Sequence, residues 1–479
     1  MRFEVVPFLY ASFLRYAMPN PLWMKYLELS PATSLQFHKH HEAHAAECFF
    51  QSGFKRAAVL VVDGRGENES TTFWKANGRE LVLLDSKPPS VSVGYLYLIF
   101  TSLLGFRYGD EYKVMGLSSY GSPVYGEEIL RLHNSPDPKM LRDPYLMHLS
   151  LHAFGLGKPP GRPPKSSLFS RFFRRYPLEF EDKADIAASL QWATERIVMG
   201  YAKKLQKITD EDYLCLSGGV AQNSVLNGKI IFKAGFEKVF VSSCPNDAGT
   251  AVGAAILSAF EDAKKPDFRA EYTAASPFLG PDLSIENAIR LSEKEGFSYR
   301  KLKEPLQIVS QLLCEGEVVG IAMGRAEFGP RALGHRSILA NPSDEDMKDR
   351  INKIKGRELF RPLAPSVKAE KAADYFASGN ADSPYMSFVF EAKKKTCQLA
   401  PAIVHVDGSS RIHTVDRKLQ PDYWKLLDCF EKLAGFPILL NTSLNIAGYP
   451  LAATEKDVIA TMKRSALRYL LLDDYLVEK

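Results

Sequence analysis

The chain has 479 residues, of which 46% are hydrophobic and 24% charged, so it can bury a large core and has room for two or three domains. A net charge of +5 does not mark the whole chain as a polyanion-binding protein, because six of its basic residues lie in one acid-free stretch, 157–177. These residues are Lys158, Arg162, Lys165, Arg171, Arg174 and Arg175. The stretch predicts a solvated surface insertion, with contact to nucleic acid or phosphate as the alternative.

The cysteines and the apolar stretches indicate in which cellular compartment the protein is expected. Six cysteines are scattered without a CxxC pair, and several lie in apolar runs such as 213–216, which indicates buried thiols in a reducing cytoplasm. Near the start, Arg15, Pro19, Pro21 and Lys25 interrupt the apolar residues before they reach membrane-spanning length. We therefore expect neither a signal peptide nor a transmembrane helix, and no membrane partner.

Apolar segments that each end in a polar, glycine-containing turn predict an α/β fold. Strands are expected at 57–62, 213–216, 239–243 and 317–323, helices at 220–230 and 250–260, and a further buried strand at 437–440. Prolines and glycines make 264–281 the best linker. A boundary near Ala275 divides the chain into two α/β domains, residues 1–275 and 276–479.

Two histidines predict a metal site. His40 and His44 lie four residues apart among strong helix formers, so both imidazoles can face one metal ion, whereas His41 would point elsewhere. Asp247, on the turn after the third strand, is the best-placed third ligand. A set of two histidines and a carboxylate suits iron, manganese or zinc. Surface or hydrogen-bonded core histidines are the alternative for this spacing.

Several turns in the first half have the composition of ligand-binding loops. Asp63 opens an Asp-Gly-Arg-Gly-Glu turn that could bind a nucleotide phosphate or a metal-bound water, or form a plain hairpin turn. Gly218 and Gly219 would let the backbone approach a ligand at a helix N-terminus. Asn223 would hold a ribose or simply bond the backbone, and Lys113 would bind a phosphate or form a surface ion pair.

The second half concentrates cations around backbone turns. The planar guanidinium of arginine matches phosphate oxygens, so the set predicts a site for a triphosphate and a second phosphate. Its members are Arg325, Arg331, Arg336, Lys355, Arg357, Arg361 and Arg411. Arg331 and Arg361 lie in apolar, proline-containing settings that are unusual for a solubilising residue. Asn441 and Ser443, placed after the last strand, would bind a nucleotide or a carbamoyl amide, or form a polar turn.

Taken in order, seven motifs resemble one family. They are His-His-Glu-Ala-His-Ala, Asp-Gly-Arg-Gly-Glu, Lys-Val-Met-Gly-Leu, Ser-Gly-Gly-Val-Ala-Gln-Asn, Glu-Phe-Gly-Pro-Arg-Ala-Leu-Gly, Arg-Glu-Leu-Phe-Arg-Pro-Leu-Ala-Pro-Ser and Asn-Thr-Ser-Leu-Asn. This series resembles the O-carbamoyltransferases of nodulation-factor, cephamycin and aminoglycoside biosynthesis. The resemblance covers nearly the whole chain from about Phe37.

The resemblance implies a first domain of the actin-like ATPase superfamily, which is ribonuclease H-like and related to tRNA threonylcarbamoyl-transfer enzymes, and a YrdC-like second domain. It implies ATP-dependent transfer of a carbamoyl group from carbamoyl phosphate, through carbamoyl adenylate, to a hydroxyl of a small natural product, with Mg²⁺ accompanying ATP. By this resemblance the adenylating site would contain Arg331, Lys355 and Arg361 as catalytic residues, with Arg411, Asn441 and Ser443 as binding residues. His40, His44 and Asp247 would hold the metal.

One departure from the family affects the expected activity. Members usually open with a glycine-containing hairpin and an early histidine, and the chain has no such motif before Phe37. We therefore expect either a start further upstream or a shortened paralogue that binds nucleotide without turnover. A tRNA-modifying enzyme of the threonylcarbamoyl class is the remaining alternative, although nucleic acid is not the expected partner. A homodimer is compatible with the sequence, and the acceptor cannot be read from it.

Overall fold

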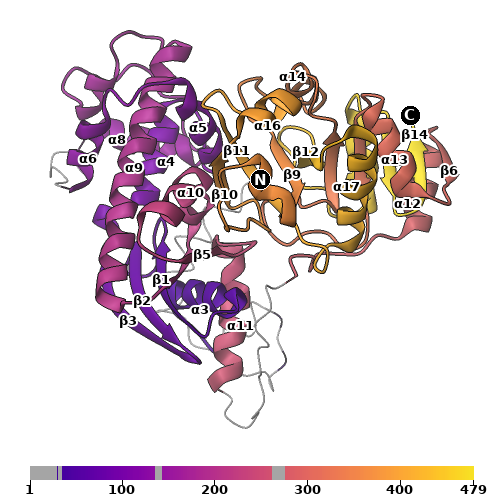
Figure 1. Ribbon diagram of the computed structural model, residues 1–479. Coiled ribbons are helices and arrows are strands. Elements are labelled where there is room, and N and C mark those ends of the chain that lie inside the picture. Colours follow the sequence, from indigo (N-terminus) through magenta and orange to yellow (C-terminus); the bar gives the residue numbers. More distant parts are fainter. Residues whose placement is uncertain (1–27, 29, 31–34, 135–142, 262–275) are drawn as a thin grey trace.

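A computed structural model of the chain describes residues 28, 30, 35–134, 143–261 and 276–479. It confirms the α/β class and contains two sheets, one in each half of the sequence (Figure 1). The expected boundary near Ala275, most of the expected linker and the start of the chain lie outside the described residues.

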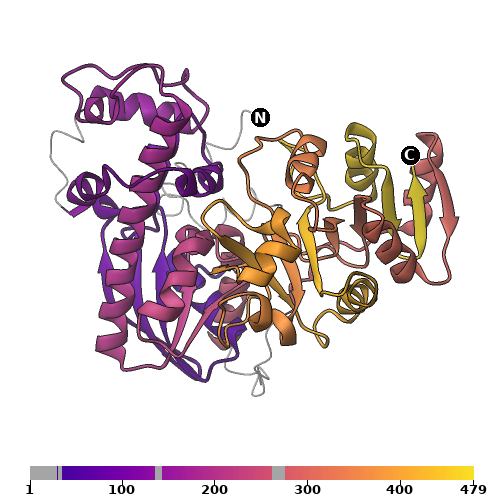
Figure 2. The same cartoon turned by 45° about the horizontal axis from the view of Figure 1, so that its top comes forward.

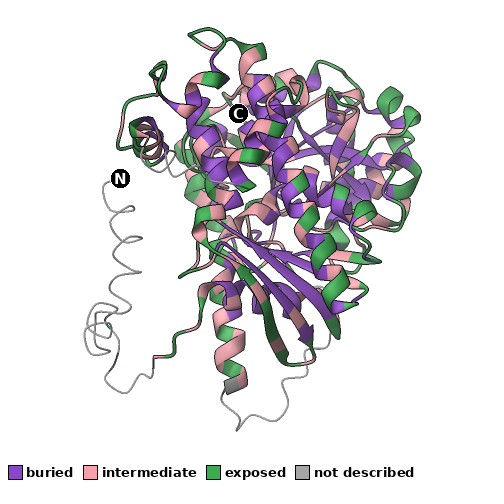
Figure 3. Cartoon of the chain, turned by 90° about the vertical axis from the view of Figure 1, so that its left-hand side faces the viewer, coloured by how far each residue is buried: buried purple, intermediate pink, exposed green. Residues whose placement is uncertain are grey.

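The first sheet has five strands in the order β3-β2-β1-β4-β5. Its strands are β1 (Arg56–Val62), β2 (Thr71–Asn77), β3 (Glu80–Lys87), β4 (Tyr213–Ser217) and β5 (Lys238–Val241). The pairs β1-β2 and β2-β3 are antiparallel, while β1-β4 and β4-β5 are parallel. β1 is buried after its first residue because α3 and α9 pack against it, whereas the edge strand β3 is largely exposed (Figure 3).

Parallel pairing brings the carboxyl ends of three strands to one edge of this sheet. Asp63 directly follows β1, Ser217 is the last residue of β4, and the segment after β5 leads to Asp247. In α/β proteins this edge is where ligands bind. The topology therefore gathers the polar turns that the sequence spreads over almost 200 residues.

Helices cover this sheet and extend above it. They are α3 (His40–Ser52), α4 (Val93–Leu103), α5 (Glu111–Leu117), α6 (Gly126–Asn134), α8 (Pro144–Ala153), α9 (Phe180–Thr209), α10 (Ser224–Lys233) and α11 (Thr250–Glu261). α3 and α11 touch through their backbones, since a Cβ at Gly253 would lie 1.8 Å from the carbonyl oxygen of Ala43. Only glycine permits this approach.

The helix expected at 250–260 is confirmed as α11, but the one expected at 220–230 is wrong in its bounds. A 3-10 turn covers Gly219–Gln222, and α10 begins only at Ser224. Asn223 lies between them as the N-cap, and its side-chain oxygen accepts a hydrogen bond from the amide of Leu226 at 3.1 Å. Asparagine competes with helix continuation by bonding the local backbone, which accounts for the break.

The second sheet has nine strands in the order β10-β11-β9-β12-β8-β7-β13-β14-β6. Its strands are β6 (Ser298–Lys301), β7 (Val319–Ala322), β8 (Arg336–Ala340), β9 (Ala364–Lys368), β10 (Phe388–Glu391), β11 (Ser409–Val415), β12 (Ile438–Ser443), β13 (Tyr469–Leu472) and β14 (Tyr475–Glu478). Its helices are α12 (Ile285–Lys294), α13 (Pro305–Cys314), α14 (Met347–Ile354), α15 (Ala372–Tyr375), α16 (Lys394–Leu399), α17 (Pro421–Ala434) and α18 (Glu455–Arg464). The strand expected at 437–440 is longer than predicted, so Asn441 and Ser443 lie inside β12.

The two halves pack directly against each other through α10 and β10 and through α5 (Figures 1 and 2). The side-chain amide of Asn227 donates to the carbonyl of Ser387 at 3.0 Å. On α5, the carbonyl of Gly116 lies 3.1 Å from Nε2 of His405. The two halves are therefore joined by direct contacts.

None of the helices in the described ranges has the length and apolar character needed to cross a membrane. Of the cysteines, Cys48, Cys215 and Cys244 are buried as expected, whereas Cys397 is exposed.

A buried histidine in the second half predicts acid sensitivity. His413 is fully buried between Ser366 and Gln420, and burial lowers its pKa to about 3. In the unfolded chain the imidazole of His413 takes up a proton near pH 6.5, whereas in the folded state it stays neutral down to about pH 3. The folded state therefore has its full stability above pH 6.5 and loses stability as the pH falls toward 3. We expect about 2 kcal/mol of unfolding free energy to disappear between pH 6.5 and 5 through this residue.

Urea unfolding at pH 7.5 and pH 5 would measure this loss. The unfolding free energy at pH 7.5 minus that at pH 5 should be about 2 kcal/mol smaller in His413→Gln than in the native protein. It should be unchanged in His148→Gln, a control at a partly exposed histidine. An equal pH response in the native protein and the His413 variant would contradict the expectation.

Candidate functional site

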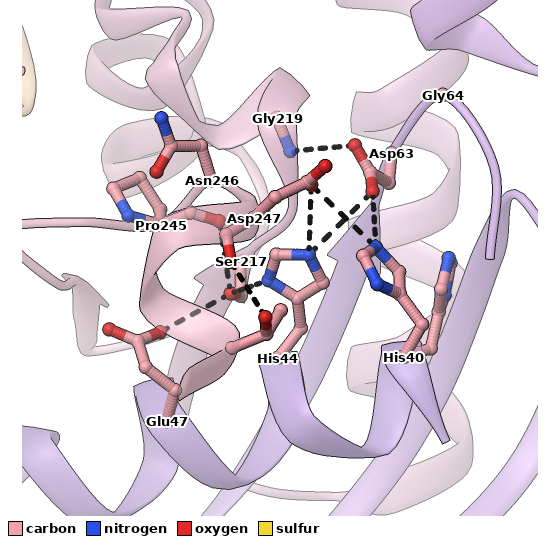
Figure 4. Close-up of polar contacts among 12 residues, drawn as sticks. His40, His44, Glu47, Asp63, Gly64, Ser217, Gly219, Pro245, Asn246 and Asp247 are labelled. Atoms are coloured by element: carbon pink, nitrogen blue, oxygen red, sulfur yellow. Dashed lines mark hydrogen bonds and ion pairs between the residues drawn. The ribbon is translucent and has the colours of Figure 1, made fainter. Parts of the chain in front are cut away.

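Four side chains from three separate segments converge at the carboxyl edge of the first sheet (Figure 4). They are His40 and His44 from the first turns of α3, Asp63 after β1, and Asp247 in the turn before α11. Their nearest ligand atoms all lie within 4.8 Å of one another. We call these four residues the four-ligand cluster. The fold brings together His40, His44 and Asp247, as predicted, and adds Asp63 to them.

The contacts within the cluster leave a shared point between the two rings and the two carboxylates. Oδ2 of Asp63 lies 3.0 Å from Nε2 of His40 and 3.6 Å from Nε2 of His44. Oδ1 of Asp247 lies 3.6 Å from each of these nitrogens. The His41 ring turns away and bonds Thr72 Oγ1 at 3.0 Å, as the helical spacing predicted.

The cluster fits a divalent metal ion. Among the described residues, Nε2 of His44 is fully buried without a hydrogen-bond partner, although it faces two carboxylates. Burial disfavours a charged His44, but the nearby carboxylates of Asp247 and Asp63 outweigh this effect and raise the pKa of His44 to about 9. The two carboxylates therefore attract positive charge to this point, and a metal ion can replace the proton. Two imidazoles and two carboxylates suit iron, manganese or zinc.

A second row of polar residues orients His44. Ser217 Oγ lies 3.2 Å from Nδ1 of His44 and can donate to Glu47 Oε2 at 3.4 Å (Figure 4). Glu47 is completely buried, and this burial raises its pKa to about 7. When Ser217 donates to Glu47, its oxygen accepts the Nδ1 proton of His44, and Nε2 is left to bind a metal.

Ser217→Ala should therefore weaken metal binding, although the serine hydroxyl bonds His44 and is not itself a proposed metal ligand. We expect about 10- to 100-fold lower affinity, the usual effect of removing a partner that orients a metal ligand. Competition with a coloured chelator would measure it, and Ser258→Ala on the far end of α11 is the matched control. An unchanged affinity in Ser217→Ala would show that the hydroxyl does not orient His44.

The paired glycines after β4 hold Asp63. The amide of Gly219 donates to Oδ1 of Asp63 at 3.0 Å. Gly218 has φ of 88°, and a Cβ there would lie 2.3 Å from the carbonyl oxygen of Val62. The close backbone approach at these glycines is to Val62 and to the carboxylate of Asp63, and ligand binding by Gly218 and Gly219 stays a prediction.

Two other predicted binding residues have protein partners. Asn223 caps α10 and exchanges hydrogen bonds with Gln191, its Nδ2 lying 2.9 Å from Gln191 Oε1. Lys113 pairs with Asp110 at 2.9 Å and with Glu358, in the second half, at 3.3 Å. Both contacts match the structural alternatives that the sequence left open, and Lys113 joins the two halves.

Five cations of the second half form a group, which we call the cationic set: Arg331, Lys355, Arg357, Arg361 and Arg411. Burial lowers the pKa of Arg331 to about 10, and burial together with Arg361 lowers that of Arg357 to about 9. Burial and the charges of Arg331, Arg357 and Arg361 hold the pKa of Arg411 well below its usual range. Within the described parts of the chain, Glu358 is the one acidic residue in an ion pair with the set.

The cationic set has donors without protein acceptors. Among the described residues, Nη2 of Arg357 and Nε of Arg411 are buried and have no hydrogen-bond partner. Uncompensated buried cations are costly, so an arrangement of this kind is typical of an anion site. The set can bind phosphate oxygens.

Lys355 is positioned by β12 and the segment after it. Its Nζ donates to the carbonyl oxygen of Ser443, to Ser443 Oγ at 3.2 Å and to Asn445 Oδ1 at 2.7 Å. Burial, with Arg357 and Arg361 nearby, holds the pKa of Lys355 well below its usual range. Asn441 is buried, and its Nδ2 donates to the carbonyl of Ala332 and to Ser366 Oγ at 3.2 and 2.9 Å.

Two arginines expected in the anion site have structural partners instead. Arg336 is fully buried and donates to the carbonyls of Met323 and Gly324, both at 2.9 Å. Arg325 donates to the carbonyls of Leu279 and Gly280 at 2.7 and 3.0 Å. Backbone carbonyls accept hydrogen bonds from both guanidiniums, although Nε of Arg336 has no partner among the described residues, so neither arginine is placed in the cationic set, contrary to the prediction.

The basic stretch of the first half is partly neutralised within the fold. Arg171 pairs with Glu128 and Arg175 with Asp182, both at 2.5 Å. The guanidinium of Arg174 lies 5.3 Å from the centre of the Tyr125 ring. These contacts support the interpretation of this stretch as surface structure.

Two segments of the first half contact the cationic set, and one of them also bonds the four-ligand cluster. Arg331 Nη2 donates to the carbonyl of Gln222 at 3.4 Å, in the turn whose Gly219 bonds Asp63. On α5, the ring of Tyr112 lies 4.7 Å from Cζ of Arg361. A small pocket also lies between the halves, lined in part by Ser243, Pro245 and Arg331.

Sequence comparison identifies the family. The sequence models of the carbamoyltransferase N-terminus and the carbamoyltransferase C-terminus match residues 10–256 and 310–479. Nodulation protein NolO of Bradyrhizobium diazoefficiens is 37% identical over 92% of this chain and 78% of that protein. Nodulation protein NolNO of Sinorhizobium fredii is 35% identical over 94% of this chain and 65% of that protein.

A crystal structure of full-length HypF overlaps 50% of the chain with a TM-score of 0.28 and 18% identity, too little to inform the site. The two family matches together cover most of the sequence, and the first begins before Phe37, earlier than the motifs indicated. The chain therefore belongs to the carbamoyltransferase family. It is a transferase of carbamoyl groups, which confirms the activity that the motifs predicted.

Proposed function

We propose that the chain is an ATP-dependent O-carbamoyltransferase that makes carbamoyl adenylate at the cationic set and transfers the carbamoyl group at the four-ligand cluster. The observation that carries this proposal is the largely buried group of cations, two of which have unpartnered donors among the described residues, joined by the 219–222 turn to a cluster suited to a metal ion. One site can hold phosphates, and the other can polarise a carbonyl.

Activation at the cationic set follows from its charge. Water cleaves carbamoyl phosphate to carbamate and inorganic phosphate, and a carbamate oxygen then attacks the α-phosphorus of ATP while pyrophosphate leaves. The negative charge on the transferring and departing phosphates is stabilised by Arg331, Arg361 and Lys355. Arg411 binds the same phosphates, and Ser443 orients Lys355 through its hydroxyl. Asn441 supports this site from inside the sheet through Ala332, which follows Arg331.

Transfer at the four-ligand cluster then completes the reaction. The acceptor oxygen attacks the carbonyl carbon, AMP leaves, and the acceptor hydroxyl loses its proton. A bound divalent ion held by His40, His44, Asp63 and Asp247 would polarise that carbonyl. The contacts between the halves keep the reactive adenylate away from bulk water.

The finer organisation is part of the same proposal. The antiparallel β3-β2-β1 arrangement followed by parallel β4 and β5 supports an actin-like, ribonuclease H-like first domain, and the second sheet would be the YrdC-like domain, with the boundary near residue 275. The partners are carbamoyl phosphate, ATP with Mg²⁺ and a small hydroxyl acceptor in the cytoplasm, without nucleic acid or a membrane. A homodimer is compatible with this organisation.

Pyrophosphate release tests the proposal. Metal-loaded protein with ATP should release pyrophosphate only when carbamoyl phosphate is added, and labelled pyrophosphate should exchange into ATP under the same conditions. Threonine and bicarbonate in place of carbamoyl phosphate should give no release. Exchange that needs threonine would assign the chain to threonylcarbamoyl chemistry instead, and exchange with neither donor would reject adenylate formation.

A further inference from the structure

One acidic side chain lies among the cations of the second half. Glu358 belongs to the loop that carries Arg357 and Arg361, and its Oε2 lies 3.6 Å from Nη1 of Arg361. A carboxylate and a phosphate offer the same kind of oxygen to a guanidinium. Glu358 can therefore compete with a phosphate for Arg361, and the cationic set binds a nucleotide tightly only where this competition is limited.

A lysine from the first half holds the other oxygen of this carboxylate. Nζ of Lys113, on α5, lies 3.3 Å from Oε1 of Glu358 and 2.9 Å from Oδ1 of Asp110. The side chain of Lys113 is only 18% exposed, so solvent screens these pairs less than it screens pairs on the open surface. Glu358 is thus shared between Lys113 and Arg361, and its contact with Arg361 is the longer of the two.

The helix that carries Lys113 is fixed against the loop that carries Glu358. A Cβ at Gly116, on α5, would lie 3.3 Å from Cδ of Pro362, so the helix backbone packs closely on the end of the loop. In the 3-10 turn after α5, the hydroxyl of Tyr120 donates to the carbonyl of Phe360 at 3.1 Å. The ammonium of Lys113 therefore has a defined position beside the carboxylate.

Arg361 is also held, whereas the carboxylate between the two cations has room to move. The side-chain amide of Asn352 donates to the carbonyl of Arg361 at 3.0 Å, and the ring of Tyr112 lies 4.7 Å from its Cζ. The side chain of Arg361 is 16% exposed, but that of Glu358 is 38% exposed. Glu358 is therefore the member of the three that can turn toward one cation or the other.

We propose that Lys113 is a positioning residue for nucleotide binding, which holds Glu358 away from Arg361 and so keeps this guanidinium available to the phosphates of ATP. The inference rests on the ATP-binding part of the proposed function. When the lysine charge is lost, the carboxylate closes on Arg361, and a phosphate then has to displace it. The affinity of the second half for ATP thereby depends on a side chain of the first half.

A double-mutant cycle on the whole chain tests this role, with the Kd for ATP and Mg²⁺ measured by calorimetry. Lys113→Met should raise the Kd about 10-fold, the order expected for competition by one charged hydrogen bond. In the Glu358→Gln background the same change should leave the Kd where it was, because no carboxylate remains to close on Arg361. Lys113→Arg keeps the charge and should keep the native Kd.

Turnover distinguishes positioning from a loss of folded protein. In the pyrophosphate-release assay, Lys113→Met should raise the KM for ATP by a similar factor and keep kcat, because saturating ATP displaces the carboxylate. Circular dichroism would check the fold, and Lys113→Gln repeats the cycle if the methionine variant does not fold. The matched control is Lys463→Met, which removes the lysine of a 2.6 Å ion pair with Glu295 and should bind ATP as the native protein does.

Three results would overturn the inference. They are an unchanged Kd in Lys113→Met, a fall in kcat without a change in KM, and a rise in Kd that persists in the Glu358→Gln background, which would show that Lys113 contacts the phosphates itself. If the cycle behaves as expected but carbamoyl phosphate elicits no pyrophosphate release, the proposed reaction fails and the inference stands. No binding of ATP by the native protein would reject both.

Discussion

Asp63→Asn is expected to release the metal and to lower carbamoyl transfer by more than about 100-fold, beyond the usual effect of residues that only orient metal ligands. One oxygen of Asp63 lies between both histidines, and the other accepts the amide of Gly219. Asparagine keeps the shape but removes the charge that attracts a cation, and its NH₂ group would face either the rings or a backbone donor. Bound metal after dialysis and labelled carbamoyl transfer would measure the two losses.

Asp85→Asn is the control for this substitution. Asp85 is a carboxylate of β3 that pairs with Lys204 at 2.5 Å, on the same sheet but away from its ligand-binding edge. This variant should retain the metal and the activity. Full metal occupancy in Asp63→Asn would remove Asp63 from the ligand set.

Lys355→Met is expected to reduce carbamoyl phosphate-dependent pyrophosphate release by about 10²- to 10³-fold, as when one preorganised donor to a developing charge is lost. Its ammonium is held by Ser443 and Asn445 inside a group of like charges, where water cannot replace it. ATP should stabilise the native protein by about 2.7 kcal/mol at one hundred times its Kd, and the variant by clearly less at the same concentration.

Lys353→Met is a control two residues away, because Lys353 is exposed in the last turn of α14. Its pyrophosphate release and its stabilisation by ATP should equal those of the native protein. A Lys355 variant with undiminished release would exclude this lysine from the activation step.

The sequence predicted three members of the four-ligand cluster, whose metal binding stays a proposal, better than it predicted their arrangement. His40 and His44 could be found from helical spacing alone, and Asp247 from its position after a strand. The role of Asp63 could not be decided, because only the parallel pairing of β1 with β4 brings its carboxylate beside the glycine turn and the histidines. Strand order is not encoded in any local pattern. Glu47 and Ser217 were missed for the same reason, since their roles depend on His44.

The partners of the individual arginines could not be predicted from the sequence. Arg331 and Arg336 lie only five residues apart, yet one joins the cationic set and the other bonds the carbonyls of Met323 and Gly324. Their charge is the same, and the proline before Arg331 and the histidine before Arg336 do not predict these different partners, so only the three-dimensional structure distinguishes them. The fold class was easier to predict, because apolar runs that end in glycine-containing turns indicate it directly. The late start of α10 was harder to predict, because it depends on one capping side chain, that of Asn223.

The glycine contact between α3 and α11 links the coordination geometry to a residue that carries no ligand. The two histidines lie in the first turns of α3, and Asp247 begins the 3-10 turn that leads into α11, so the separation of these helices affects the distance between the imidazoles and that carboxylate. A methyl group at Gly253 would meet the carbonyl of Ala43 and force the helices apart. The spacing of the ligands thus depends on the lack of a side chain at Gly253. A substitution there, at a residue that does not contact the ion, can change which ion the site prefers.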